Sequence, residues 1–253
     1  MIVCKSSAEI DAMRAASALV AEVLGELAGM VVPGVSTLDL DVEAERLVRA
    51  AGAEPAFKGY RGYPCTLCAS TNDEVIHGIP SRRPLTEGDI VSLDMGVKQH
   101  GFFGDSAVTV PVGRVSDEAQ LLLRVTRESL EKAIAQVRLG GRVSDIGHAV
   151  QQHVEAHGFS VVREFVGHGI GASLHEEPQI ANYGDPGRGP RLAEGMTLAI
   201  EPMVNAGRPA VKVLSDGWTA VTRDGSLSAH FEHTVAVTRD GPLVLTRPSA
   251  RVR

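Results

Sequence analysis

The stretch Ser92-Leu93-Asp94-Met95-Gly96, followed by Gly104-Asp105-Ser106, determines how the rest of the chain is interpreted. Apolar and polar side chains alternate along its first part, which predicts a strand with one apolar face and one face that carries Asp94. Asp94 and Asp105 lie at equal distances from the midpoint between Gln99 and His100, so an unbulged antiparallel hairpin would place them directly opposite each other. Two opposed carboxylates repel, and the pattern therefore indicates a cation between them.

Composition sets the broad class. The chain has 253 residues, of which 43% are hydrophobic and 22% charged, as in a globular protein of one large domain or two small ones. Its net charge of −6 argues against a nucleic-acid or anionic-membrane partner. We expect no signal peptide and no membrane span, since Glu22 and Glu26 interrupt the best candidate. Three cysteines fit a reducing cytoplasm better than a disulfide framework, so we expect a cytoplasmic protein.

The order of elements repeats. Capping signals and glycines predict two helices before the acidic hairpin and two after it, over residues 7–30, 37–52, 117–139 and 144–158. Residues 85–94 also align with residues 192–201, which places Asp94 on Glu201. Chance similarity between common strand patterns is the alternative, but the second helices of the two halves align as well. We therefore expect an α+β fold in a single catalytic domain, 1–253, with an internal pseudo-repeat of about 1–112 and 113–253.

The repeat predicts two further acids. Glu201 ends one strand of the second hairpin, and Glu232 lies on the return strand 231–237. Four carboxylates in one partly buried site cannot all stay ionised alone, and two divalent cations would balance their charge. His168 is the best fifth ligand because its flanking glycines allow close backbone approach. Two ions roughly 3.5–4 Å apart can activate water and polarise a carbonyl, which is the chemistry of amide or ester hydrolysis.

Each of these residues also has a plainer interpretation. A single acid on a strand is more often a solvated or edge-protecting charge. His77 and His175 could be polar loop residues, but they match across the repeat, which favours catalytic use.

Three other motifs do not have the sequence context that a redox, zinc or nucleotide site requires. Cys65 and Cys68 have CxxC spacing, yet residues 65–71 are typical of a strand, whereas a redox motif opens a helix. His153 and His157 lack the glutamate directly after the first histidine that zincins need, so they favour a solvated helix face. Residues 167–171 are glycine-rich, but no helix start follows as a nucleotide loop requires.

A set of motifs runs in order over essentially the whole chain: Asn72-Asp73-Glu74-Val75-Ile76-His77-Gly78-Ile79-Pro80, Leu93-Asp94, Gly104-Asp105, Gly167-His168-Gly169-Ile170-Gly171, Leu174-His175-Glu176-Glu177-Pro178, Ile200-Glu201-Pro202-Met203 and Phe231-Glu232-His233-Thr234. In these motifs the chain resembles type I methionine aminopeptidases, in the short bacterial form without an N-terminal extension. The resemblance implies a pita-bread fold of two pseudosymmetric halves. It also implies removal of the initiator methionine from nascent proteins whose second residue is small.

The resemblance further implies the role of each site residue. The metal ligands would be Asp94, Asp105, His168, Glu201 and Glu232. Asp105 and Glu232 would bridge the two ions, and Glu201 would also take a proton from the attacking water. His175 would hydrogen-bond the scissile carbonyl as it becomes an oxyanion, and His77 would contact the scissile nitrogen or the next amide. These assignments fit the use of a carboxylate as base and of a neutral imidazole as oxyanion donor.

The methionine pocket should be apolar, with aromatic and sulfur-compatible walls. The expected wall residues are Phe57, Tyr60, Tyr63, Cys68, Leu174 and Trp218. Phe57 stands where bacterial relatives often have cysteine, Leu174 where phenylalanine is more usual, and Gly96 where threonine is common. The pocket is thus the part in which this sequence departs most from the family pattern.

For cofactors we expect two divalent ions, Co, Mn, Fe or Zn, all of which accept this ligand set. The family also suggests a monovalent cation near Asn72 and Ser228. The expected partners are nascent polypeptide N-termini at the ribosome, and the expected oligomeric state is a monomer. Two alternatives remain: a dipeptidase of the prolidase or aminopeptidase P kind, and a catalytically inactive binding protein on the same fold.

Overall fold

The structure is a computed structural model and describes residues 1–247. The helices are α1 (Ser7–Met30), α2 (Thr37–Ala50), the short 3-10 helix η1 (Tyr60–Gly62), α3 (Asp117–Ile134) and α4 (Val143–Ala156). The strands are β1 (Glu54–Pro55), β2 (Cys68–Thr71), β3 (Glu74–Ile76), β4 (Ile90–Gln99), β5 (Phe102–Pro111), β6 (Ser160–Val161), β7 (Gly167–Gly169), β8 (Glu176–Ile180), β9 (Thr197–Ile200), β10 (Met203–Asn205), β11 (Val211–Val213), β12 (Ala220–Thr222), β13 (Ser228–His230), β14 (Glu232–Thr238) and β15 (Gly241–Val244).

Helices α1, α2 and α3 start where the capping signals predict them, whereas α4 starts at Val143, one residue before the predicted start, with Arg142 at its N-cap. The hydroxyl of Ser6 accepts from the Glu9 N–H, and the Glu9 carboxylate accepts from the Ser6 N–H, which completes a capping box at α1. Ser36 and Asp39 form the same box at α2. Helix α3 ends at Ile134 rather than at the predicted residue 139. After it the backbone forms tighter hydrogen bonds between residues three apart, from Gln136 to Ala133 and from Val137 to Ile134.

Two stretches with strand-like sequence form shorter strands than their sequence suggests. Residues 161–166 are rich in valine, which is typical of a strand, but the strand there is limited to β6, which pairs with β10, and the next strand is β7. The strand expected over 65–71 begins at Cys68, after a bend at residues 66–67. Both short strands lie at sheet edges, β6 beside β10 and β2 beside β4.

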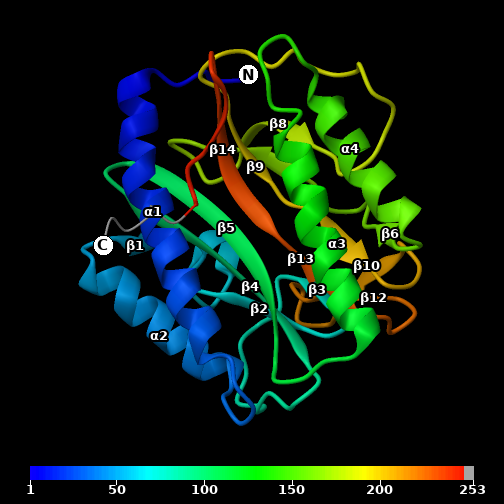
Figure 1. The fold of residues 1–253 in the computed structure, drawn as a ribbon. Helices are drawn as coiled ribbons and strands as arrows, with labels where there is room; N and C mark the ends of the chain where they lie inside the picture. Colours follow the sequence, from blue (N-terminus) through cyan, green and yellow to red (C-terminus); the bar gives the residue numbers. More distant parts are fainter. Residues whose placement is uncertain (248–253) are drawn as a thin grey trace, which may run out of the picture.

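A nine-stranded antiparallel sheet forms the centre of the described residues, with the path β1-β4-β5-β14-β9-β7-β8; the remaining two strands are β2, which pairs with β4, and β15, which pairs with β14. Strands β5 and β14 meet in the middle, with β4 on the outer side of β5 and β9 on the outer side of β14. Helices α1 and α3 cross the same face of this sheet, one over each half, as Figure 1 shows.

The helices cover the apolar face of the sheet. In the first half, apolar side chains of α1 and α2 pack on Val91, Leu93 and Met95 of β4. In the second half, α3 and α4 pack on the corresponding side of β9 and β14, including Leu198 and Val235. Because side chains alternate along a strand, Asp94 and Glu232 point to the opposite face, away from all four long helices. The site therefore lies on the face without helices.

The predicted register of the acidic hairpin was wrong by two residues. Asp94 pairs with Ala107, and Asp105 pairs with Gly96, so the two acids are diagonal neighbours rather than direct partners. The turn falls on His100 and Gly101, both with positive φ, as a tight two-residue hairpin turn requires. A shift by two residues keeps both acids on the same face, which is why the predicted face was right.

The N-terminal segment ties the two halves together. Lys5 donates its backbone N–H to Gly195 in the second half, and its ammonium forms an ion pair of 2.5 Å with Glu176 at the start of β8. The two side chains are only 3% and 13% exposed. Glu176 also accepts from the Ser173 N–H, so the ion pair anchors the loop between β7 and β8. In residues 1–247, no helix is long and apolar enough to cross a membrane.

We expect Lys5→Met to lower the free energy of unfolding by about 3–5 kcal/mol, because it leaves the Glu176 carboxylate buried without its counter-charge. Lys58→Met is the matched control, since Lys58 forms an ion pair with Glu45 that is 42% and 24% exposed, and about 1 kcal/mol or less should be lost there. Urea unfolding of both variants measures the difference. Equal losses in the two variants would contradict a structural role for the buried pair.

Candidate active site

Five side chains from both halves converge on one cavity. Asp94 comes from β4, Asp105 from β5, His168 from β7 and Glu232 from β14, and Glu201 follows directly after β9. All five line a cavity of about 160 Å³ on the face of the sheet without helices. The structure thus brings together the four acids and the histidine that the sequence predicts as ligands.

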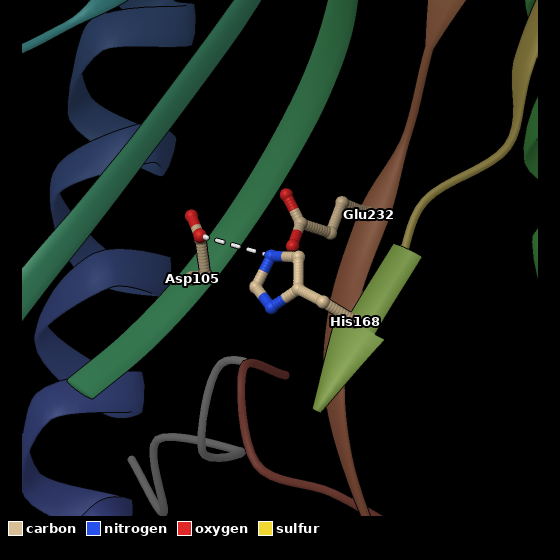
Figure 2. A group of neighbouring side chains, drawn as sticks. All are labelled: Asp105, His168 and Glu232. Carbon is tan, nitrogen blue, oxygen red and sulfur yellow. Dashed lines mark ion pairs between the residues drawn. The ribbon is translucent and has the colours of Figure 1, made fainter. Parts of the chain in front are cut away.

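The imidazole of His168 is fixed by its own backbone turn. Its Nδ1–H donates to the carbonyl oxygen of Gly169 at 2.8 Å, which leaves Nε2 as the free nitrogen. Nε2 lies 4.0 Å from Asp105 Oδ2 and 3.7 Å from Glu201 Oε1. Figure 2 shows Asp105, His168 and Glu232 pointing toward one another, and their donor atoms lie within 4.8 Å of each other. These three residues form the tightest potential metal-binding group among the described residues.

The site concentrates negative charge without a balancing side chain. Asp94, Asp105 and Glu232 are each less than a tenth exposed, and each has one oxygen with no hydrogen-bond partner among the described residues. Burial raises the pKa of Asp94, Glu201 and Glu232 well above their usual range, and nearby carboxylates add to the shift. Burial also raises the pKa of Asp105 to about 7.

These properties fit a metal centre. In residues 1–247, neither lysine nor arginine forms an ion pair with any of the four acids, so a cation is needed to keep them ionised. Burial lowers the pKa of His168 to about 4, which keeps its ring neutral and able to bind a metal. Carboxylate oxygens with one imidazole are a donor set for divalent first-row metals.

Two further histidines line the same cavity. The ring of His175 lies 4.2 Å from that of His168, centroid to centroid, and its Nδ1 lies 3.0 Å from the hydroxyl of Tyr60. Burial lowers the pKa of His175, and the nearby charge of Arg61 lowers it further. His77 follows β3 in a left-handed conformation, φ 59°, and burial lowers its pKa to about 4. Both rings are therefore neutral at pH 7.

The residues expected around the methionine side chain line the same cavity. The cavity walls include all of the expected residues: Phe57, Tyr60, Tyr63, Cys68, Leu174 and Trp218. Tyr63 is buried with its ring edge against Trp218, and its hydroxyl lies 3.0 Å from the carbonyl oxygens of Leu67 and Gly78. Cys68 is buried, and burial raises the pKa of its thiol, so it contributes a neutral sulfur-containing wall.

The residues suggested for a monovalent cation lie side by side. The N–H of Ser228 donates to the carbonyl oxygen of Asn72 at 2.8 Å, and the Asn72 side chain accepts from Ile90 and donates to Asp89. Asn72 takes a positive φ of 57°.

Two residues near the site were missed from the sequence. Arg61 lines both the 160 Å³ cavity and a wider neighbouring cavity of about 540 Å³, and its guanidinium lies over the Tyr60 ring. His230 is 1% exposed, and its Nε2 lies 3.7 Å from Glu201 Oε2. The alternation along the chain could have identified His230, because it is two residues before Glu232 and so shares its face.

Comparisons with known proteins identify the family. Residues 11–239 match the model of metallopeptidase family M24. The chain is 53% identical to methionine aminopeptidase 1 of Bacillus subtilis over 247 residues, which cover 98% of this chain and all of that protein.

Solved structures agree with the sequence comparison. A methionine aminopeptidase from Thermotoga maritima superposes with a TM-score of 0.96 at 48% identity, and the match covers 98% of this chain and 100% of that one. A prolidase from Pyrococcus furiosus reaches a TM-score of 0.80 at 21% identity and is covered over 66% of its length, which shows a shared fold alone. The expected pita-bread fold is thereby confirmed, and the chain belongs to metallopeptidase family M24 and, within it, to the methionine aminopeptidases.

Proposed function

We propose that this enzyme hydrolyses the peptide bond after the initiator methionine of nascent proteins, and that it does so with the residues assigned below. The observation that carries the proposal is the convergence of four carboxylates, three of them buried, and one imidazole beside an apolar cavity that also holds two neutral histidines. The first part supports metal-assisted hydrolysis, and the second supports recognition of one apolar N-terminal side chain.

Divalent ions would be held by Asp94, Asp105, His168, Glu201 and Glu232. We propose two ions, Co, Mn, Fe or Zn, with Asp105 and Glu232 shared between them as the family resemblance implies. The oxygens of Asp94, Asp105 and Glu232 that lack a hydrogen-bond partner among the described residues support metal binding by all three acids. When bound, the ions would lower the pKa of a water molecule and polarise the scissile carbonyl. A monovalent cation near Asn72 and Ser228 remains part of the proposal.

Glu201 and the two histidines would handle protons and hydrogen bonds. The Glu201 carboxylate accepts a proton from the attacking water, a role that its position at the cavity wall supports. The Tyr60 hydroxyl can donate to Nδ1 of His175, which leaves the ring proton on Nε2. This Nε2–H would then donate to the oxygen of the scissile carbonyl as that oxygen gains negative charge. His77 would contact the scissile nitrogen or the next amide.

Substrate selection follows from the walls of the cavity. Phe57, Leu174 and Trp218 supply apolar surface for the methionine side chain, and Cys68 supplies a soft sulfur contact. His77 and His175 crowd the same cavity, which supports a requirement for a small second residue. A dipeptidase of the prolidase kind is the competing substrate class, and the 21% identity to the Pyrococcus prolidase gives it no further support.

We further propose the setting in which the enzyme works. Its substrates would be nascent chains at the ribosome in the cytoplasm, and it would act as a monomer. The chain would be one catalytic domain made of duplicated halves, about 1–112 and 113–253, of which the last six residues lie outside the described ones.

Glu201→Gln tests the assignment of the base. We expect at least about a 100-fold loss of turnover on Met-Ala-Ser, because the amide cannot accept a proton, while the fold is retained. Release of free methionine is measured with added Mn(II), and Gly-Pro is offered in parallel to test the dipeptidase alternative. Glu194→Gln, at an exposed ion pair with Arg239, is the control and should behave as wild type. Wild-type turnover by Glu201→Gln would refute the assignment.

The proposed bridges predict different metal contents. Glu232→Ala should lower the number of bound Mn(II) ions toward zero, because a bridging carboxylate contributes to both ions, whereas His168→Ala should leave about one ion per chain. Titration calorimetry counts the ions without any need for activity. If both variants lose metal equally, the bridging assignment is wrong or the ions bind only together.

A further inference from the structure

His230 is a histidine that the mechanism above does not use. Its side chain is 1% exposed, yet neither ring nitrogen has a hydrogen-bond partner among the described residues. An unpaired buried polar group costs about 1–3 kcal/mol, so such a group in the middle of a protein needs a functional explanation.

The position of His230 is rigid. Its backbone N–H donates to the hydroxyl of Thr109 on β5 at 2.8 Å, and that hydroxyl donates to the His230 carbonyl oxygen at 2.7 Å. Met203 pairs with it on β10. With its backbone held from two sides, His230 keeps its buried ring beside the Glu201 carboxylate.

Glu201 lies between two imidazoles. His168 Nε2 is 3.7 Å from its Oε1, and His230 Nε2 is 3.7 Å from its Oε2. The backbone carbonyl of Glu201 is held separately by the side-chain amide of Asn182 at 2.9 Å. The final torsion of a glutamate side chain is soft, so the plane of the carboxylate is set by whatever contacts its two oxygens.

We infer that His230 is a positioning residue that donates its Nε2–H to Glu201 Oε2 and so fixes the plane of this carboxylate in the working enzyme. A separation of 3.7 Å is too long for a hydrogen bond, and the contact needs to shorten by less than 1 Å. Catalytic hydrogen bonds are often long before ligands bind and tighten afterwards. The inference rests on the proposed role of Glu201 as ligand and base, and it goes beyond that role by naming what orients it.

Replacing His230 tests the inference. We expect His230→Leu to lower kcat by about 10–100-fold with KM changed by less than about threefold, as for other residues that orient a ligand or base. His230→Gln keeps an N–H donor of similar reach and should recover most of that loss. His233→Leu is the control: His233 is partly buried, and it lies on the helix face with its Nδ1 2.8 Å from Thr246 Oγ1. That control should lower the melting temperature and leave kcat within about twofold.

Metal binding and a double variant separate the possible roles. His230→Leu should bind the same number of Mn(II) ions as wild type by titration calorimetry, with a Kd raised about tenfold. Loss of an ion would overturn the inference, because His230 would then be a ligand. In a Glu201→Gln background, His230→Leu should cause no further loss of kcat, since there is no longer a base to orient.

The outcomes distinguish this inference from the proposed function. If Glu201→Gln keeps wild-type turnover, the proposed role of Glu201 fails first. If Glu201→Gln loses turnover but His230→Leu does not, only the inference fails. If His230→Leu does not fold, His230→Met and His230→Gln are compared instead. They have similar volumes and differ in the N–H donor, so equal kcat values would overturn the inference.

Discussion

The whole structure depends on keeping four carboxylates close together inside one site. Burial alone raises their pKa values, and each lies near others of the same charge. A short isolated segment could not hold these carboxylates together, because they would repel one another and become solvated. Here the acids lie on or directly after strands whose opposite faces pack against helices. The strands could move apart under the repulsion only by disrupting two hydrophobic cores. The cores thereby provide the rigidity that the charge requires.

The pairing of β5 with β14, which joins the two halves of the sheet, is short. Strands β5 and β14 pair at only two described positions, Glu232 with Ala107 and His233 with Ser106. Side-chain hydroxyls extend this short seam. Thr234 bonds both the N–H and the carbonyl oxygen of Asp105, and Ser106 donates to the carbonyl oxygen of Glu232. Each of these bonds fixes the backbone of a proposed ligand, so the seam that joins the halves also sets the distance between their acids.

The sequence predicts features that depend on local patterns. Alternation along β4 identifies the face of Asp94, and the repeat identifies Glu201 and Glu232 before any partner is known. Features that depend on the backbone of a turn are harder to predict. The hairpin register was missed by two residues because His100 adopts a positive φ beside Gly101, which is uncommon for a residue with a side chain. The position of Arg61 in the wall of both cavities likewise depends on a loop conformation, φ 49°, that no sequence periodicity predicts.

Phe57, Gly96 and Leu174, the three departures from the pattern expected for the family, are connected by packing contacts or by a shared cavity. Phe57 and Leu174 come from different halves and pack in one apolar cluster at the cavity. A methyl carbon added to Gly96 would lie 2.9 Å from the Phe57 ring and 2.9 Å from the Ala56 methyl, so there is no room for a threonine there. The aromatic ring at position 57 thus occupies the space that a side chain at position 96 would need. Phe57 and Leu174 line the same cavity, so the size of one side chain limits the space left for the other. We therefore propose that Gly96, Phe57 and Leu174 form one packing solution for the proposed methionine pocket, in which the proposed metal ligands are left unchanged.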